Sequence, residues 1–570
     1  MNNKTRIVLL ISGITILSPV FSTAQNTNIP PEEKMKMHHE VLGDSYLPNA
    51  FQGKKTSPAQ TYTGSNIFTT QVNVNASGQN IVGDAANEPS IAVDASDPNR
   101  MVIGWRQFDN VSSDFRQAGW AYSTDAGHTW TFPGVIEPGI FRSDPVLDFD
   151  TAGTFYYNSL TSNSNGYFCK VFKSDDGGAV WDAGVAAQGG DKQWMTIDRS
   201  VGVGTGNIYA YWTSYYSSCP PGNFTRSTNG GNSFENCVEV PGNPYWGTLA
   251  TGNNGELYLV GSAYTDGLMV AKSSTAQTPG ATITWDFSTY VDIDGYIAMQ
   301  TPVNPGGLLG QAYIDVDHSN GPGRGNVYVL ASVIRISNSD PADVMFVKST
   351  DGGQTWNFPV RVNDDPAAYN YQWFGTMSVA PNGRIDAVWL DTREDMTSSD
   401  ISALYYSYSL DQGETWSVNE KLSPTFNPHL GYPQQIKMGD YFELQSDNDG
   451  AHLAWANTLN GEEDVYYSYI TPPIDGIGNI VKTDTYLSVT CYPNPFRDLT
   501  TIRYQIPREE VITLSIFNVY GQEITTLVNK KQPAGIYTIS YASADLPAGY
   551  YYCRLSSGSA TKTTSLVKVK

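Results

Sequence analysis

Short stretches in which apolar and polar residues alternate cover much of residues 67–471. Residues 89–94 form one such stretch, and a turn-type segment separates it from a second apolar stretch at residues 101–105. This pattern is typical of β-strands that bury one face, so we expect an all-β fold. Comparable units start near seven positions, which are Glu88, Asp144, Asp191, Tyr245, Gln311, Gln372 and Gly439.

One short motif recurs behind these stretches, with the pattern Ser-x-Asp-x-Gly-x-x-Trp or a close variant. Its five copies start at Ser123, Ser174, Ser227, Ser349 and Ser409. The residue types suit a turn, because Asp accepts hydrogen bonds from nearby backbone N–H groups, glycine adopts positive φ and tryptophan packs between sheets. Repetition at such spacing predicts one supersecondary unit used several times.

The motif resembles the Asp-box, or BNR repeat, of sialidase-like β-propellers. That resemblance implies a β-propeller over residues 67–471 in which the motif itself is structural. Residues 83–471, divided among seven units, give about 56 residues a unit, which suits a four-stranded blade. We expect seven blades, with six, the number in true sialidases, as the alternative. Residues 67–74 are expected to supply an outer strand that the last unit lacks.

The two ends of the chain carry the features of export signals. Lys4 and Arg6, an apolar run and small residues before Gln25 predict a signal peptide over residues 1–24, followed by an extension at residues 25–66. After a linker at residues 472–486, short strands and glycine turns over residues 487–570 predict a small β-sandwich.

This C-terminal region closely resembles type IX secretion sorting domains. The resemblance rests on Cys491-Tyr-Pro-Asn-Pro-Phe496, on several glycine turns and on the terminal Ser565-Leu-Val-Lys568. It implies transport across an outer membrane, so we expect a secreted or surface-attached protein that is exported through the periplasm.

Composition narrows the range of partners. The net charge of −22 becomes −24 when the two positive charges of Lys4 and Arg6 leave with the signal peptide, which disfavours nucleic acid and anionic membranes. No segment approaches the ~20 apolar residues of a membrane-spanning helix, so no membrane insertion is expected. We expect a monomer whose partners are a glycan or polysaccharide and the type IX secretion machinery.

Cysteines and acidic turns supply the remaining structural hypotheses. Cys219 and Cys237 flank one short segment and could bridge it, since export permits disulfides. Asp-rich turns at residues 148–150, 292–294, 315–317 and 447–449 could hold a structural Ca²⁺, although none has the full EF-hand spacing. The competing interpretation is that they are ordinary β-turns, and no other cofactor is indicated.

In a propeller, the loops that lead into the innermost strands and those that leave the second strands surround one central depression. Here they hold aromatic rings, carboxylates and arginines, which suit a saccharide. The candidate catalytic residues are Glu88, Asp144, Asp440 and Tyr441. The candidate substrate-binding residues are Arg106, Arg142, Arg393, Asp391, Trp194, Trp246 and Trp373, with no metal ligand among them. A structural interpretation competes, in which these tryptophans and Arg–Asp pairs hold blades together.

Three functions follow from these residues. The first is a sialidase-like glycoside hydrolase, for which the resemblance implies three arginines that bind a carboxylate, a Tyr nucleophile with a Glu partner, and an Asp that acts as acid/base. The family's Arg-Ile-Pro signature is absent, and residues 141–145 are only a loose echo of it. The alternatives are a polysaccharide lyase, which needs a His or Tyr base, and a non-catalytic propeller that binds glycans or proteins.

Overall fold

The computed structural model describes residues 38–569, except residues 42, 49–52, 164–165, 264–266, 339, 367–368, 396–399, 474–486, 493, 507, 534, 543–545 and 559. The described residues form β-strands and one 3₁₀ helix, η1 (Ser214–Tyr216), with no α-helix among them. None of them forms a helix long and apolar enough to cross a membrane. The expected all-β fold is confirmed, while the predicted signal peptide and most of the predicted linker lie outside the described residues.

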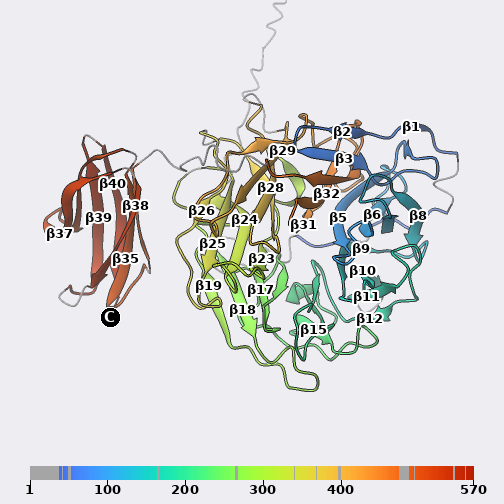
Figure 1. Cartoon of the computed structure of the whole chain (residues 1–570), viewed down its shortest axis with the longest axis horizontal. Helices are drawn as coiled ribbons and strands as arrows, with labels where there is room; N and C mark the ends of the chain where they lie inside the picture. Colours follow the sequence, from blue (N-terminus) through green and yellow to red (C-terminus); the bar gives the residue numbers. More distant parts are fainter. Residues whose placement is uncertain are drawn as a thin grey trace, which may run out of the picture.

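Seven antiparallel sheets follow one another through the described part of residues 61–470 (Figure 1). The first three are β5 (Ala85–Val93), β6 (Met101–Phe108), β7 (Arg116–Ser123) and β8 (Thr131–Ile136); β9 (Ser143–Phe149), β10 (Phe155–Asn163), β11 (Gly166–Ser174) and β12 (Val185–Ala186); and β13 (Trp194–Ile197), β14 (Ile208–Tyr211) and β15 (Phe224–Ser227). The fourth is β16 (Leu249–Thr251), β17 (Leu257–Ser262), β18 (Leu268–Ser273) and β19 (Phe287–Val291).

The remaining sheets complete the series. The fifth is β23 (Tyr313–Val316), β24 (Val327–Arg335), β25 (Asp343–Ser349) and β26 (Val360–Arg361), with β20 (Gly295–Tyr296) also on β24. The sixth is β27 (Gln372–Val379), β28 (Ile385–Asp391), β29 (Ala403–Ser409) and β30 (Glu420–Lys421). The seventh is β31 (Glu443–Ser446), β32 (Ala451–Asn457), β33 (Asp464–Ile470), β3 (Ile67–Gln71) and β2 (Thr61–Thr63). Two small hairpin-like pairs, β1 (Thr56–Pro58) with β4 (Gln79–Ile81) and β21 (Met299–Thr301) with β22 (Asn304–Leu308), lie outside these sheets.

The seven sheets are arranged in a ring. The innermost strand of each sheet contacts that of the next, in the order β5, β9, β13, β16, β23, β27 and β31, and β31 in turn contacts β5. These strands begin at or close to the seven unit starts expected from the sequence. The loops that lead into them are therefore brought around one axis.

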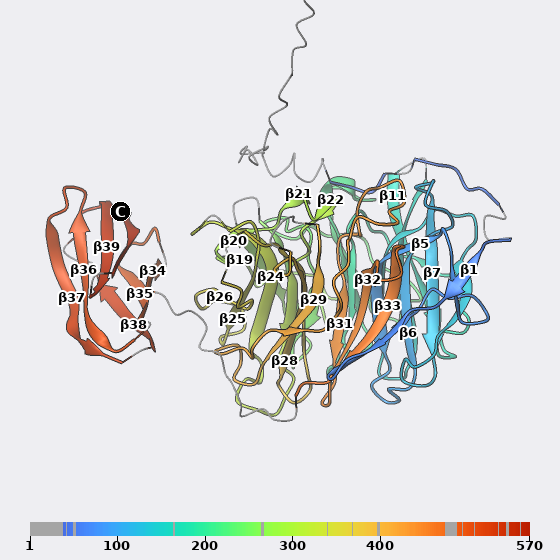
Figure 2. The same cartoon turned by 90° about the horizontal axis from the view of Figure 1, so that it is seen from above.

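The N-terminal strand β3 closes the ring. It pairs antiparallel with β33, from Ile67 opposite Ile470 to Gln71 opposite Tyr466, and Figures 1 and 2 show the blue N-terminal strands beside the orange ones. The backbone N–H of Val72 extends the pairing by donating to the carbonyl of Val465 at 2.9 Å. This is the outer strand that residues 67–74 were expected to supply.

The repeated motif forms the same turn in all five copies. In the fourth copy, the backbone N–H of Gly353 donates to Ser349 Oγ at 2.8 Å, and that of Thr355 donates to Asp351 Oδ1 at 2.9 Å. The equivalent bonds recur in the other four copies. Trp356 ends the turn with its ring buried against neighbouring strands. The turn therefore holds each third strand to the strand that follows.

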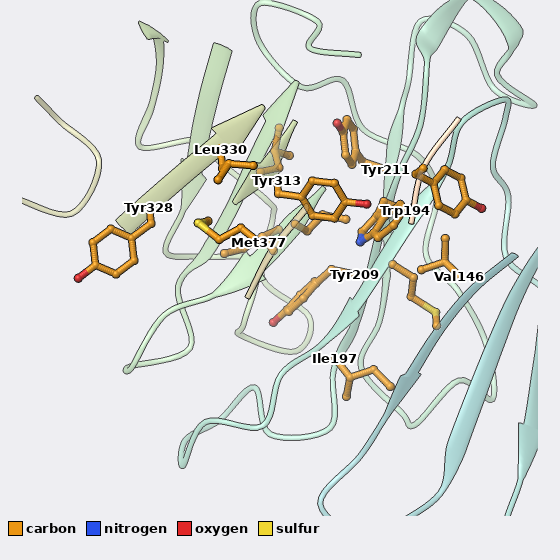
Figure 3. Close-up of a cluster of buried hydrophobic side chains, with 14 of the residues drawn as sticks. Val146, Trp194, Ile197, Tyr209, Tyr211, Tyr313, Tyr328, Leu330 and Met377 are labelled. Carbon is orange, nitrogen blue, oxygen red and sulfur yellow. The ribbon is translucent and has the colours of Figure 1, made fainter. Parts of the chain in front are cut away.

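The core runs from sheet to sheet through apolar and aromatic side chains. One buried cluster joins Val146, Trp194, Tyr313, Leu330 and Met377, which come from four different sheets (Figure 3). Rings as large as these bury 150–250 Å² each and dominate such contacts. Neighbouring sheets are thus held together mainly by packing, because strand pairing operates within each sheet.

The C-terminal strands form two sheets that face each other. One contains β34 (Ser488–Tyr492), β35 (Leu499–Ile506) and β38 (Gly535–Ala542), and the other contains β37 (Glu523–Gln532), β36 (Glu510–Asn518), β39 (Gly549–Ser557) and β40 (Ala560–Lys568). Ile502, Ile512, Leu514, Cys553 and Leu566 fill the space between them. The expected small β-sandwich is confirmed.

One disulfide joins Cys219 and Cys237, as the sequence allowed. Their Cα atoms lie 6.4 Å apart, within the usual range for a disulfide. The bridge closes the segment that leads from β14 through β15, in the sheet with the fewest strands. Next to the bridge, Val238 pairs with Phe224 of β15 through an isolated β-bridge.

Removing one repeated-turn carboxylate tests the structural role of the motif. Asp351→Ala loses acceptors for the backbone N–H groups of Gln354 and Thr355, so unfolding should become easier by about 1 kcal/mol. Glu239→Ala, at an exposed position outside the motif, should change stability by less than about 0.5 kcal/mol. Urea midpoints measure both, and equal midpoints for the two variants would contradict a stabilising role.

Candidate functional site

A residue with left-handed backbone stands at or just before the innermost strand of each sheet. These residues are Glu88 (φ 49°), Asp144 (46°), Lys192 (56°), Trp246 (58°), Gly310 (150°), Phe374 (55°) and Gly439 (92°). Residues other than glycine rarely adopt positive φ, at a cost of roughly 1–3 kcal/mol, and such residues gather at functional sites. Five of the seven sheets accept this cost, which indicates that the direction of these side chains matters.

The side chains of Glu88, Asp144 and Lys192 meet beside the axis of the ring. They form one network of close contacts between acidic and basic side chains with Arg106 of β6 and with Lys437 and Asp440, which precede β31. A seventh member comes from the N-terminal segment. We call the group formed by Glu40, Glu88, Arg106, Asp144, Lys192, Lys437 and Asp440 the central cluster, and all of its members are buried.

Glu40 accepts the largest number of contacts in the central cluster. Its Oε1 lies 2.7 Å from Arg106 Nη1, 3.2 Å from Lys192 Nζ and 3.3 Å from Lys437 Nζ. Its Oε2 accepts hydrogen bonds from Arg116 Nη2 and, at 2.9 Å, from Ser143 Oγ. Five donors from five separate places in the chain therefore converge on one carboxylate.

The charges around Glu40 keep it ionised. Burial raises its pKa, but the nearby positive charges, led by Arg116 and Arg106, outweigh burial and hold the pKa well below its usual range. A carboxylate that accepts several charge-assisted hydrogen bonds is strongly stabilised in its ionised form. The donor set is thus suited to bind a carboxylate anion.

Two further carboxyl groups of the central cluster have opposite protonation. Burial raises the pKa of Glu88 to about 8, against the opposing effect of Arg106, so Glu88 carries a proton at neutral pH. For Asp440, burial also raises the pKa, but His38, Lys192 and Lys437 lower it well below the usual range. A protonated and an ionised carboxyl group therefore face the same place, a pairing typical of acid–base sites.

Asp144 contacts both the backbone and the side chain of Lys192. It accepts a hydrogen bond from the backbone N–H of Lys192 at 3.0 Å, and its Oδ2 lies 3.6 Å from Lys192 Nζ. Burial raises the pKa of Asp144, against the charge of Lys192. Asp144 therefore both orients the left-handed turn at Lys192 and contributes charge to the cluster.

An aromatic layer adjoins the central cluster. Tyr441 donates its hydroxyl hydrogen to the carbonyl of Pro145 at 2.8 Å, and its ring meets the edge of Trp194 at 5.1 Å. Trp194 continues to Tyr313, and Figure 3 shows these two rings turned toward each other. Burial raises the pKa of Tyr441 well above its usual value. Tyr441 and Trp194 therefore belong to the packed wall beside the charges.

His38 completes the surroundings of the cluster. Its Nε2 lies 3.1 Å from Asp440 Oδ1, and its ring meets Trp246 edge-on at 5.7 Å. The indole N–H of Trp246 is buried without a hydrogen-bond partner among the described residues. Of the predicted binding tryptophans, Trp246 is the one placed against the N-terminal segment.

Several predicted site residues pair with groups outside the central cluster. Arg142 pairs with Glu137, and Trp373 packs on Phe374 with its N–H on Ser402. Arg393 and Asp391 pair with each other, and Arg393 also reaches Asp364, in the loop after β26, at 2.7 Å. The three arginines that the sialidase resemblance implies, Arg106, Arg142 and Arg393, therefore pair with different carboxylates.

Sequence reasoning missed Glu40, Arg116, Lys192 and Lys437. Lys192 stands in a loop that leads into an innermost strand, next to Asp191, so its position was available from the repeat. Lys437 lies three residues before Asp440, in the segment that precedes β31, so its position was also available from the repeat. Glu40 belongs to the N-terminal extension, where no repeat or motif indicates that a side chain reaches the axis.

The central cluster also contains a group of possible metal ligands. Oxygens of Glu40, Glu88 and Asp144 lie within 4.8 Å of one another, the one group of three or more such ligands found among the described residues. Arg106, Lys192 and Lys437 already contact these oxygens, and Glu88 carries a proton at neutral pH. The positive charges of these three side chains disfavour the binding of a metal cation there. The structural Ca²⁺ at one of the Asp-rich turns stays a prediction.

Comparison with known proteins bears first on the C-terminal region. Residues 490–570 match the family described as the secretion system C-terminal sorting domain. This region is a type IX sorting domain. The match confirms the expected export, which delivers the protein to the cell surface or the extracellular space. No curated protein matches the chain.

Solved structures with related chain arrangements are distant. A protein of unknown function from Dyadobacter fermentans is 13% identical, covering 72% of this chain and 100% of that chain, with a TM-score of 0.40. An α-L-arabinofuranosidase from Fusarium graminearum, solved with an iminosugar inhibitor, is 11% identical over 72% of this chain and 98% of that chain, with a TM-score of 0.38. A Trypanosoma rangeli sialidase, solved with the inhibitor DANA, is 10% identical over 90% and 89%, with a TM-score of 0.35. Similarities this distant say nothing about substrate or reaction, which depend on the residues of the site.

The protonation of Glu88 makes a testable contribution to stability. Its pKa is about 8 in the folded protein and about 4.5 when unfolded, so the folded state holds the extra proton between these values. Its stabilising contribution is complete below the lower value and is lost as the pH rises through about 8. Relative to Glu88→Gln, the wild type should therefore lose up to about 1.4 kcal/mol per pH unit in this window.

Urea unfolding of both proteins at several pH values measures this difference. Glu239→Gln, at an exposed position, serves as the control and should follow the wild-type profile. A constant difference between wild type and Glu88→Gln from pH 5 to 8 would contradict a protonated Glu88.

Proposed function

We propose that the mature protein is an exported glycan-active protein that holds an acidic saccharide at the central cluster and cleaves a glycosidic bond beside it. The observation that carries the proposal is the convergence of five buried donors on one carboxylate position, next to carboxyl groups of opposite protonation. Uronic acids and other acidic sugars carry a carboxylate group. Arginine and lysine pairs are well suited to hold it.

The geometry supports Glu88 as proton donor and Asp440 as the ionised partner. Lys437 Nζ lies 3.2 Å from Glu88 Oε1 and 2.7 Å from Asp440 Oδ2, so these oxygens are at most about 6 Å apart. This upper bound lies below the ~6.5–9.5 Å spacing of inverting glycosidases and is compatible with the ~5–5.5 Å of retaining ones. We therefore propose Glu88 as general acid and Asp440 as nucleophile, with Asp144 positioning Lys192.

The narrower sialidase hypothesis has less support. A tyrosine nucleophile needs a carboxylate base at its hydroxyl, whereas the Tyr441 hydroxyl donates to the carbonyl of Pro145. Arg142 and Arg393 are engaged by Glu137 and Asp391. The proposal is consequently a glycoside hydrolase with a carboxyl pair, and Tyr441 keeps a packing role in it.

The lyase alternative requires a neutral base beside the cations. Among the described residues of the central cluster and its immediate surroundings, Tyr441 donates to a carbonyl and His38 belongs to the segment that also carries Glu40. Neither observation favours Tyr441 or His38 as the base that abstracts a proton. A non-catalytic glycan-binding role shares the same carboxylate site, and the experiment below distinguishes it from hydrolysis.

Glycan cleavage can be tested with oligosaccharides that contain uronic acids and with sialosides, by mass spectrometry of the products. Because Glu40 occupies the donors, the wild type and Glu40→Ala are both assayed. Glu88→Gln and Asp440→Asn, made in whichever background is active, should lower kcat by roughly 10²- to 10⁴-fold and change KM much less.

Glu443→Gln provides a matched control. Glu443 lies in the innermost strand β31, and burial raises its pKa to about 8, as for Glu88. Its carboxylate accepts a hydrogen bond from the backbone N–H of Ile91 and is not a member of the central cluster. This variant should keep its activity. Binding of acidic oligosaccharides without any turnover would favour the non-catalytic alternative, and no binding by any variant would contradict the proposal.

A further inference from the structure

The segment that carries Glu40 is not part of the ring framework. Residues 38–48 contain no strand where they are described, and Val41 and Leu47 are 53% and 63% exposed. Glu40 and His38 are nevertheless only 1% and 5% exposed, because both side chains enter the ring while Val41 and Leu47 stay outside. Two buried side chains at the start of an otherwise exposed segment indicate an inserted group.

The donors around Glu40 have other partners that would keep them in place without it. Arg106 Nε donates to Asn87 Oδ1 at 2.8 Å, and its Nη2 donates to Gln435 Oε1 at 2.8 Å. Lys192 and Lys437 lie 2.9 Å and 2.7 Å from Asp440 Oδ2. These donors, which we call the cradle, are therefore positioned by the ring strands and their loops. Their positions do not depend on Glu40.

The segment makes further contacts on either side of the Glu40 carboxylate. His38 Nε2 lies 3.1 Å from Asp440 Oδ1, and the backbone N–H of Glu40 donates to Asp191 Oδ1 at 3.0 Å. Arg116 Nη2 donates to the carbonyl of Val41 at 2.8 Å. The later contacts of the segment are exposed and contribute little, so its attachment is concentrated at residues 38–41, around the Glu40 carboxylate.

Charge balance defines what could replace Glu40. Without it, four cations would lose the carboxylate that contacts all of them; they are Arg106, Arg116, Lys192 and Lys437. A negatively charged group is therefore the replacement that these buried donors favour. Three of the donors meet one oxygen of Glu40 and two meet the other, an arrangement that fits the two acceptor oxygens of another carboxylate.

We propose that residues 38–40 occupy the ligand site in place of the ligand, which we call the stand-in role. The Glu40 carboxylate takes the position of a ligand carboxylate, and it must leave before that ligand binds. The protein is latent while the segment is docked, and it gains access to its site when the segment is cut away or displaced. This inference rests on the central cluster being the ligand site of the proposed function, but not on the cleavage of a glycosidic bond.

The first test restores the missing carboxylate from solution. Thermal unfolding of Glu40→Ala is followed with increasing sodium acetate or sodium glucuronate, against sodium chloride at equal ionic strength. We expect a saturable rise in Tm for Glu40→Ala with the carboxylates, because binding to the folded state stabilises it. The wild type should show no rise beyond that in chloride.

Glu443→Ala is the matched control for this test. It also removes a glutamate carboxylate that accepts two hydrogen bonds, but the donors left behind are Ser90 and a backbone N–H, without positive charge. No carboxylate-specific rise is expected for this variant. Equal responses of Glu40→Ala and Glu443→Ala, or of Glu40→Ala in acetate and in chloride, would overturn the stand-in role.

The second test leaves Glu40 in place and applies if Glu40→Ala does not fold. A protease recognition sequence is inserted after Gly53, which is exposed and has no heavy atom within 4 Å of an added Cβ. After folding and cutting, the full chain should lose the N-terminal fragment on gel filtration in excess glucuronate and should then bind glucuronate by calorimetry. A synthetic peptide of residues 38–48 should compete with it, whereas the same peptide with Glu40→Gln should compete at least tenfold more weakly.

The outcomes separate this inference from the proposed function. A fragment that stays bound in excess glucuronate, or a cut protein that binds no carboxylate, overturns the stand-in. Carboxylate binding after cutting, without cleavage of any acidic glycan, supports the stand-in and contradicts hydrolysis. Glycan cleavage by uncut wild type that does not increase after cutting supports the function and overturns the stand-in.

Discussion

Pairing of buried charges at the axis of the ring determines how the rest of the structure is used. Each ion taken out of water loses several kcal/mol of hydration, which only close opposite charges and hydrogen bonds can restore. Arg106, Lys192 and Lys437 therefore need the carboxylates that surround them. The left-handed turns at Glu88, Asp144 and Lys192 are the backbone cost of directing these groups to one place. A fold held by its apolar contacts alone would not need such strain, so the cluster points to a role beyond stability.

Much of the fold was predictable because its signals are local and repeated. The five copies of the serine–aspartate turn fix where strands end, and the same hydrogen bonds recur in each copy. Strand alternation places the innermost strands within a few residues of their expected starts. The closing strand at residues 67–71 was also predictable, since the last unit lacked an outer strand and this segment alternates in the right way.

The site was predicted only in part, because it depends on contacts between distant residues. Glu88, Asp144, Asp440 and Arg106 follow from their places next to innermost or second strands. Arg393 occupies an equivalent place but pairs with Asp391 beside it, and a sequence pattern does not reveal which partner an arginine takes. Glu40 lies outside the repeats, and its role arises from where the folded chain returns.

Ring closure has a further consequence for the order of events in folding. Strand β3 must wait for β33, which is made about four hundred residues later, and contacts so distant in sequence form slowly. Until then the edge of β33 has no partner from β3, and such edges invite association with other chains. The cradle for Glu40 draws on the first, second, third and seventh sheets, so it becomes complete only when the circle is complete. Docking of the N-terminal segment through Glu40 therefore requires a closed ring, and an incompletely closed ring would lack part of the donor set that holds it.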